Sequence, residues 1–424
     1  MTKKLPLYGL LIVSLFPLFN IKGVSILIIS FSLLSLIYLI SDFQNRWSPD
    51  VKSFIFTSIP FSLYLIGMFY TDDIRQGFRA LEIGLPLFLF PFLHFIILGK
   101  RFVLDNNEKE ILLKSFTLSG SILIFIVIYY LYTSDAFYSL FDEEMFQKAT
   151  QNRGRDIFRW TIENTPFFGE HPTYFGLLSI FVALISVFKI SNNSYTYMFS
   201  LLMGIIGVFI SGSKMSIITL ILIGLLSLFF LIGWSIRKRL MVFCTIFVFL
   251  SIIFISIPMI KVRFTQVIET NFEPPKELRY NSTNVRIAIY QCSFVNAKKT
   301  PVLGNGTRGY IKGIKTCLRG YDTDVFKKNN WYFNSHNQYL SFILSNGIIG
   351  LILFILWLFV FLKSSIVNND KLFLLSIIVF GLMFFTENII ERQTGNVLFS
   401  FIIILFYKHN INIFTSSNIN KREG

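Results

Sequence analysis

The segment "FNSHNQYLSFILSNGIIG", residues 333–350, places a polar cluster directly in front of a long apolar run. Four polar residues, 335–338, lie where this run begins, and the apolar residues extend to position 362. About 20 consecutive apolar residues in a helix cross the roughly 30 Å hydrocarbon core of a bilayer. The segment therefore predicts a membrane-spanning helix with a polar entry at the membrane surface, and His336 lies in that entry.

The composition of the whole chain is that of a polytopic membrane protein. Of 424 residues, 53% are hydrophobic and 17% aromatic, with 50 phenylalanines and a mean hydropathy of +0.61. A soluble protein could not bury this much apolar surface without large exposed patches. The formal net charge of +15 would suit a nucleic-acid-binding protein. However, the lysines and arginines lie mainly in the connections between apolar blocks, which indicates a membrane topology instead.

Twelve apolar blocks have the length and composition of membrane spans. The first block follows Lys3 and Lys4 and resembles a signal peptide, but it lacks an A-x-A-like cleavage site, so we interpret it as a retained span. The predicted spans cover about 5–20, 22–40, 53–70, 82–99, 111–132, 172–190, 195–211, 214–234, 240–260, 338–362, 371–386 and 394–407.

The basic residues predict how these spans are oriented. With the N-terminus inside, the cytoplasmic segments hold sixteen lysines and arginines, and the short outer connections hold nine. The positive-inside rule then places both termini in the cytoplasm. The predicted parts are spans one to nine with a long outer loop at 133–171, a larger outer loop, spans ten to twelve, and a cytoplasmic tail. Their bounds are 1–260, 261–337, 338–407 and 408–424.

The larger outer loop contains one clear helical pattern and one glycine-rich turn. Apolar residues near helical spacing predict an amphipathic helix over about 284–297, which Pro301 ends. "GNGTRG" (304–309) matches G-x-G-x-x-G by letter, but it follows a helix and a proline rather than a strand, which argues against a dinucleotide site. We expect its backbone N–H groups and Arg308 to lie near an anionic ligand instead.

His336 is the first candidate for chemistry. Ser335 and Gln338 fit a capping box, with Ser335 as the N-cap and His336 as the first helical residue. The positive end of the helix dipole would disfavour imidazolium, so the histidine could accept a proton. The alternative is that His336 is only a polar residue at the membrane interface.

Several cations join His336 on the predicted outer side. They could bind a phosphate or diphosphate, although each alone could be a solvated loop charge. Charged residues are nearly missing from the predicted hydrocarbon depths, where His94 is the one deep ionisable residue. This pattern argues against an ion-coupled transporter. The outer cations are Lys214 in "SGSKMS", Arg286 in "NVRIAIY", Arg308, Arg159 in "FRWTIE" and Arg392 in "TENIIERQTG".

Two further outer residues are candidates. His171, in "EHPTYFGL", lies at the mouth of span six, where it suits a structural or acceptor-site role. Glu387 could pair with Arg392 or act as a second acid or base. The one segment with a D-x-D pattern, "YDTDVF" (321–326), is not interpreted as a metal site, so arginine and lysine would stabilise a leaving diphosphate.

The three cysteines give no CxxC or Cys/His zinc spacing. Cys292 and Cys317 could form a disulfide if their loop faces an oxidising compartment.

The sequence resembles the O-antigen ligase and O-antigen polymerase superfamily over about 160–407. "SHNQYLSFILSNGIIGLILF" (335–354) is similar to its hallmark, and four other segments support the resemblance: "HPTYFG" (171–176), "SGSKMS" (211–216), "VRIAIYQCSFVNAKKTPVLGNGTRGY" (285–310) and "TENIIERQTGNVLFSFI" (386–402).

The resemblance implies an all-helical, C-type glycosyltransferase fold without cofactor or metal. The donor would be a glycan on undecaprenyl diphosphate at the periplasmic face of the bacterial inner membrane. The acceptor would be the lipid A core for a ligase, another lipid-linked repeat for a polymerase, or a protein hydroxyl for a third type of relative. His336 matches the catalytic histidine of the family and Arg286 its diphosphate-binding arginine. Lys214 stands where ligases commonly have arginine, which keeps the charge but not the planar fork.

Overall fold

The computed structural model describes residues 4–42, 47–134, 137–140, 142, 144–146, 148, 157–190, 195–230, 235–237, 257–270, 272–276, 281–321, 323–327 and 333–407. Within these ranges the regular elements are helices, and no β-strand is formed. The tail 408–424 and most of the predicted ninth span, 240–260, lie outside them. The α-helices are α1 Lys4–Ser14, α2 Ile21–Asp42, α3 Val51–Thr57, α4 Ile59–Gly67, α5 Ile74–Gly84, α6 Pro86–Pro91, α7 Asn106–Thr133, α9 Ile157–Glu163, α10 Pro172–Lys189, α11 Tyr195–Ile210, α12 Lys214–Phe230, α14 Pro258–Glu269, α15 Ser282–Ala297, α16 Tyr310–Leu318, α17 Asp324–Lys327, α18 Gln338–Val367, α19 Lys371–Met383 and α20 Gln393–Phe406.

Several of these helices could cross a membrane. Four are long and apolar enough, namely α2, α7, α10 and α18. Two bent pairs, α3 with α4 (60°) and α5 with α6 (44°), raise the number to six if each pair is one span. Shorter apolar helices coincide with the other predicted blocks in the described residues. The all-helical class and the presence of apolar membrane helices are confirmed, whereas the number twelve stays a prediction.

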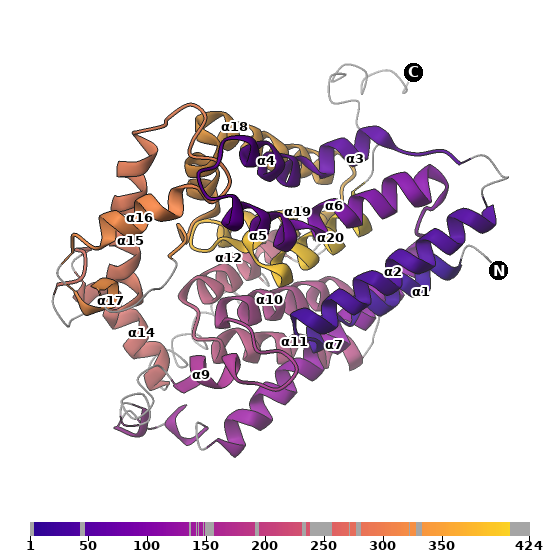
Figure 1. Ribbon diagram of the computed structural model, residues 1–424. Helices are drawn as coiled ribbons and strands as arrows, with labels where there is room; N and C mark the ends of the chain where they lie inside the picture. Colours follow the sequence, from indigo (N-terminus) through magenta and orange to yellow (C-terminus); the bar gives the residue numbers. More distant parts are fainter. Residues whose placement is uncertain are drawn as a thin grey trace.

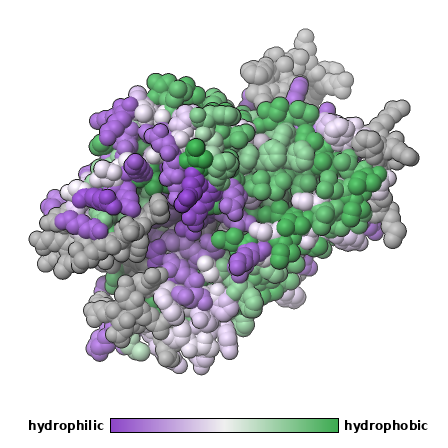
Figure 2. Space-filling model, viewed as in Figure 1, coloured by the Kyte–Doolittle hydropathy of each residue, from purple (hydrophilic) through white to green (hydrophobic). Residues whose placement is uncertain are grey.

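The core forms around α10. Residues 172–186 of this helix are all buried, and α10 packs against α7, α11, α12 and α19. Figure 1 shows α15, α16 and α17 together at one end of the molecule, with α3 and α6 on the side away from them. Hydrophilic residues gather over the end that carries α15 and α16, and hydrophobic residues cover the opposite part (Figure 2). Helices α15, α16 and α17 therefore form a polar cap on an apolar body.

The larger outer loop is held together by a disulfide between α15 and α16. Cys292 and Cys317 are bonded, with their Cα atoms 5.7 Å apart. The predicted helix 284–297 is confirmed as α15 (Ser282–Ala297). A link across 25 residues stabilises the fold by about 3 kcal/mol in the chain-entropy description. It fixes α15, the helix that carries Arg286, against the rest of the cap.

α18 is not continuous. Gly347 has φ 65° and ψ −163°, which breaks the helix. The N–H groups of Asn305 and Gly306 donate to carbonyls in the first half of α18 (2.8 and 2.9 Å), and Ile348 donates to the carbonyl of Pro301 (2.9 Å). The predicted span 338–362 lies within α18, and the helix is interrupted at Gly347. At this break, backbone groups of residues 301–306 form the hydrogen bonds that the helix itself would otherwise make.

Replacing Gly347 with alanine is expected to destabilise the protein by about 1–3 kcal/mol. The left-handed backbone disfavours a Cβ there, and the added Cβ would collide with the carbonyl oxygen of Val302. Thermal unfolding in detergent measures the effect. The control is Gly224→Ala in α12, where a Cβ has open space and helix propensity favours alanine. Equal stability of the two variants would contradict this reading of the break.

Candidate functional site

His336 lies in the turn that leads into α18, one residue before the N-cap. The N-cap is Asn337, whose Oδ1 accepts from the backbone N–H of Leu340 (2.9 Å). The predicted capping box of Ser335 and Gln338 is therefore wrong, because Ser335 donates to the carbonyl of Asn337 instead (2.8 Å). The backbone of His336 has φ 44°, in the left-handed region that is uncommon for residues other than glycine. Such strain concentrates at functional sites.

Glu387 joins His336 to Arg286. Nδ1 of His336 lies 3.3 Å from Oε2 of Glu387, and Nη2 of Arg286 donates to Oε1 at 2.5 Å. The Glu387 side chain is 6% exposed, and those of His336 and Arg286 are 27% and 28% exposed. Burial alone would raise the pKa of Glu387, but the contacts with His336 and Arg286 outweigh burial and hold that pKa well below its usual range. A carboxylate at this position favours a proton on Nδ1 of His336, and in the neutral imidazole Nε2 is then the acceptor nitrogen.

The interpretation that Glu387 pairs with Arg392 is wrong. Glu387 pairs with Arg286 and His336, and the guanidinium of Arg392 lies 5.9 Å from the ring centroid of Tyr174. Glu387 and Arg392 are nevertheless both close enough to His171 to act on its pKa, which Glu387 raises and Arg392 lowers.

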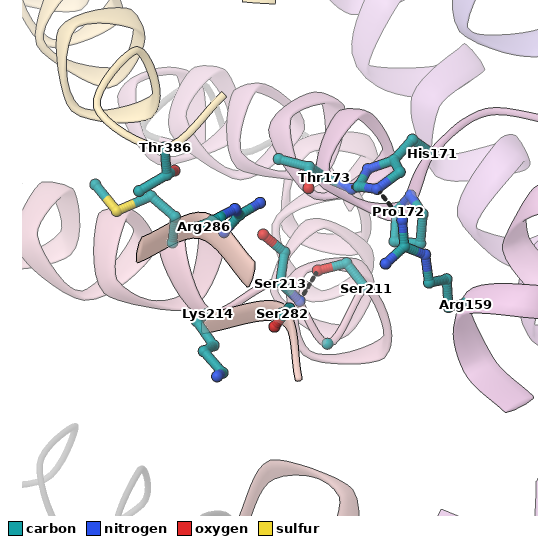
Figure 3. Close-up of a pocket in the computed structure, with 12 residues that line it drawn as sticks. Arg159, His171, Pro172, Thr173, Ser211, Ser213, Lys214, Ser282, Arg286 and Thr386 are labelled. Atoms are coloured by element: carbon teal, nitrogen blue, oxygen red, sulfur yellow. Dashed lines mark hydrogen bonds between the residues drawn. The ribbon is translucent and has the colours of Figure 1, made fainter. Parts of the chain in front are cut away.

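A cavity of about 50 Å³ lies next to this chain of side chains, and it collects four of the predicted residues. Arg159 comes from α9, His171 from the start of α10, Lys214 from the start of α12 and Arg286 from α15 (Figure 3). Hydroxyl groups complete much of the lining: Thr173, Ser211, Ser213, Ser282 and Thr386. Three cations and several hydroxyl donors around one small space suit an anionic ligand.

Lys214 follows a tight turn that directs the start of α12 to the cavity. Gly212 has φ 57°, and the N–H of Ser213 donates to Oγ of Ser211 (3.1 Å). The ammonium of Lys214 donates to Oγ1 of Thr283 at 2.9 Å. Lys214 thus contacts the first turn of α15, the helix that also carries Arg286.

His171 caps α10 and is held neutral. Its Nδ1 accepts from the N–H of Thr173 (3.3 Å), and its Nε2 lies 2.5 Å from Nη2 of Arg159. Burial, with the charges of Arg159 and Arg392, lowers the pKa of His171 to about 3, although Glu387 opposes the shift. A neutral imidazole has one acceptor nitrogen, so it cannot accept both hydrogen bonds at once. An anion in the cavity would give Arg159 an alternative partner.

We expect His171 to make stability depend on pH. Because its pKa is lower in the folded state, about 3, the unfolded chain binds more protons below its own pKa of about 6.5, and stability falls as pH falls. The contribution lost between pH 7 and pH 5 is about 2 kcal/mol. Thermal unfolding at both pH values should show a smaller loss for His171→Asn, which retains a capping side chain. An equal loss in both proteins would contradict the assignment.

Comparison with known proteins bears on the central part of this site. Residues 199–355 match the model of the O-antigen ligase family. This match supports the resemblance of the chain to the O-antigen ligase and polymerase superfamily. The matched segment includes Lys214, Arg286 and His336, and no curated protein matches the chain.

Arg308 lies in the matched segment 199–355 but outside the cavity lining. It is largely buried and lies 3.9 Å from Oε2 of Glu391. The backbone N–H groups of the "GNGTRG" turn already have protein partners. The N–H of Thr307 donates to the carbonyl of Gly67 (3.1 Å), and that of Gly306 donates to the carbonyl of Ser345 (2.9 Å). The expectation that these N–H groups meet an anionic ligand is therefore wrong, because they are bonded to backbone carbonyls of α4 and α18.

A buried polar network behind His336 was not predicted from sequence. Glu391 accepts from Ser341 and from Nδ2 of Asn388 (2.8 Å), and Asn388 is hydrogen-bonded to Ser335 (3.2 Å). On the other side, Tyr290 donates to the carbonyl of His336 (3.1 Å). The available signal was the polar pair at 388 and 391 inside the apolar C-terminal region. Among the described residues, no group of three or more His, Cys, Asp and Glu is placed to hold a metal ion.

Proposed function

We propose that the protein is an O-antigen ligase-like glycosyltransferase, which moves a glycan from undecaprenyl diphosphate to the lipid A core. The reaction would occur at the periplasmic face of the bacterial inner membrane, invert the anomeric centre and use no metal or other cofactor. Both termini would be cytoplasmic. The disulfide in the cap supports an oxidising compartment on the side of the cavity.

The observation that carries the proposal is the contact of Glu387 with both His336 and Arg286. It joins a proton acceptor to a diphosphate-binding cation across one carboxylate. The acceptor hydroxyl oxygen bonds to the anomeric carbon as the bond from that carbon to the diphosphate oxygen breaks. The hydroxyl proton passes to Nε2 of His336, and the electron pair leaves with the diphosphate.

Cations would supply the remaining stabilisation. Diphosphate is a good leaving group, so the main requirement is to balance charge on the departing oxygens. Arg286 offers a planar fork, and Lys214 and Arg159 line the same cavity. Because Lys214 carries a single ammonium, we expect it to contribute charge rather than bidentate binding.

Lipopolysaccharide from a deletion strain tests the acceptor. A ligase predicts that all long chains disappear and that the lipid-linked polymer accumulates. With purified protein, donor lipid and lipid A core, product should form at the same rate with and without EDTA. Strong inhibition by EDTA would contradict the metal-free mechanism, and unaltered lipopolysaccharide would contradict the lipid A core as the acceptor.

An O-antigen polymerase is the second candidate, and Arg159 is the observation that favours it. This residue belongs to the other long loop, 133–171, yet it lines the cavity. Two loops at one site would suit two lipid-linked substrates. A deletion strain with core plus one repeat would indicate the polymerase. Underglycosylated protein with normal lipopolysaccharide would indicate a protein O-oligosaccharyltransferase.

A further inference from the structure

A second, larger cavity lies away from the His336 site. Its volume is about 460 Å³, and it is enclosed by residues near the start of α3, the segment 94–109 and the end of α20. α3 and α6 lie on the side of the molecule away from α15–α17 (Figure 1). By the predicted topology this is the cytoplasmic end of the membrane domain.

The lining of this cavity combines apolar walls with cations. Phe102, Leu104, Ile404 and Leu405 contribute apolar surface, and the lining contains two lysines, Lys100 and Lys109. Lys100 is exposed and Lys109 is half-buried. A ligand that fits such a lining has an apolar part and an anionic head.

One acidic residue, Asp50, also lines the cavity, but its carboxylate is already bound. It caps α3 by accepting from the backbone N–H (3.3 Å) and the hydroxyl (2.7 Å) of Ser53. With two lysines against this one carboxylate, positive charge predominates in the lining.

His94 is the buried polar group of the cavity. The residue is 9% exposed, it lines the cavity, and its Nδ1 has no hydrogen-bond partner among the described residues. It lies in a π-helical segment, Phe92–Leu98. π-Helical turns are rare and frequently occur at functional sites. Buried polar atoms are normally hydrogen-bonded, so a polar group of a bound ligand could supply the hydrogen bond that this nitrogen lacks.

We propose that this cavity binds an anionic phospholipid of the cytoplasmic leaflet. The phosphate lies between Lys100 and Lys109, polar headgroup atoms approach His94, and the acyl chains follow the apolar wall toward the bilayer. The site is independent of the proposed glycan transfer, because none of its residues lines the cavity that Arg159, Lys214 and Arg286 share.

The test is lipid binding by the purified, delipidated full-length protein. Native mass spectrometry and thermal unfolding measure the binding. Phosphatidylglycerol should bind and raise the unfolding temperature, whereas phosphatidylcholine should do so much less. In Lys100→Gln/Lys109→Gln, phosphatidylglycerol should bind about thirtyfold more weakly, since each of the two juxtamembrane lysines contributes roughly 1 kcal/mol to anionic lipid binding. The effect should weaken as salt is raised.

The control is Lys298→Gln/Lys299→Gln, which removes two exposed lysines from the end of α15 and should retain wild-type phosphatidylglycerol binding. His94→Phe, which removes the polar group while keeping an aromatic ring, should also weaken binding. Equal binding by the cavity variants and wild type would overturn the proposal. Inorganic phosphate or glycerol phosphate giving the full thermal shift without lipid would overturn the assignment to a phospholipid.

Discussion

Replacement of His336 with alanine is expected to reduce glycan transfer by about 10²–10⁴-fold, the usual contribution of a general base. The reason is that Nε2 is the proton acceptor for the incoming hydroxyl, while Nδ1 is fixed 3.3 Å from Glu387. Glu387 keeps its ion pair with Arg286 in the variant, so insertion and folding should persist. Initial rates with purified protein, lipid-diphosphate donor and acceptor measure the effect, and thermal unfolding confirms that the variant is folded.

His336→Asn is the matched control for the backbone. Alanine is disfavoured at φ 44°, whereas asparagine is enriched in the left-handed region and keeps a polar side chain without a basic nitrogen. Both variants should be equally inactive. Near wild-type transfer by His336→Asn would show that the turn, and not the imidazole, supports the reaction.

Sequence reasoning succeeded where the information was local. The apolar blocks and α15 follow from hydrophobic length and period, and α15 was predicted to within two residues of its start. The collection of Arg159, Lys214 and Arg286 near one surface followed from topology alone, because the positive-inside rule assigned all three to the outer side. The cavity lining brings these residues together.

Sequence reasoning failed where two local structures were both possible and long-range contacts determined which of them forms. Ser335 and Asn337 are both good N-caps, and Ser335 is drawn instead to Asn388, which lies 53 residues away. Gly347 has the signature of close helix packing, but a backbone segment near Val302 occupies the space and breaks the helix. Such long-range partners leave no periodic signal in one sequence.

Glu387 shows the same limit at the site itself. A nearby arginine in sequence, Arg392, was the obvious partner, but Arg286, 101 residues away, makes the ion pair. This difference changes the proposed chemistry, because the carboxylate links the histidine proposed as the base to the arginine proposed to bind the donor. Glu387 would therefore position His336, rather than form an ion pair within its own loop.

Arg286→Ala is expected to reduce transfer by about 10²–10³-fold, comparable to removing one donor that stabilises transition-state charge. Arg286→Lys should recover only part of the rate, because an ammonium keeps the charge but lacks the bidentate fork. Steady-state rates over a range of donor concentrations measure whether use of the lipid-diphosphate donor is impaired.

A second explanation must be separated from this one, because Arg286 also neutralises a buried carboxylate. Its loss leaves Glu387, 6% exposed, with only His336 as an ion-pair partner, which could disturb the site without any role in donor binding. Glu387→Gln removes that charge, so the double variant Arg286→Ala/Glu387→Gln decides the question. If Arg286 binds the diphosphate, the double variant stays at least as defective as Arg286→Ala in donor use. If Arg286 only balances Glu387, the double variant recovers the activity of Glu387→Gln, and the donor-binding role is wrong.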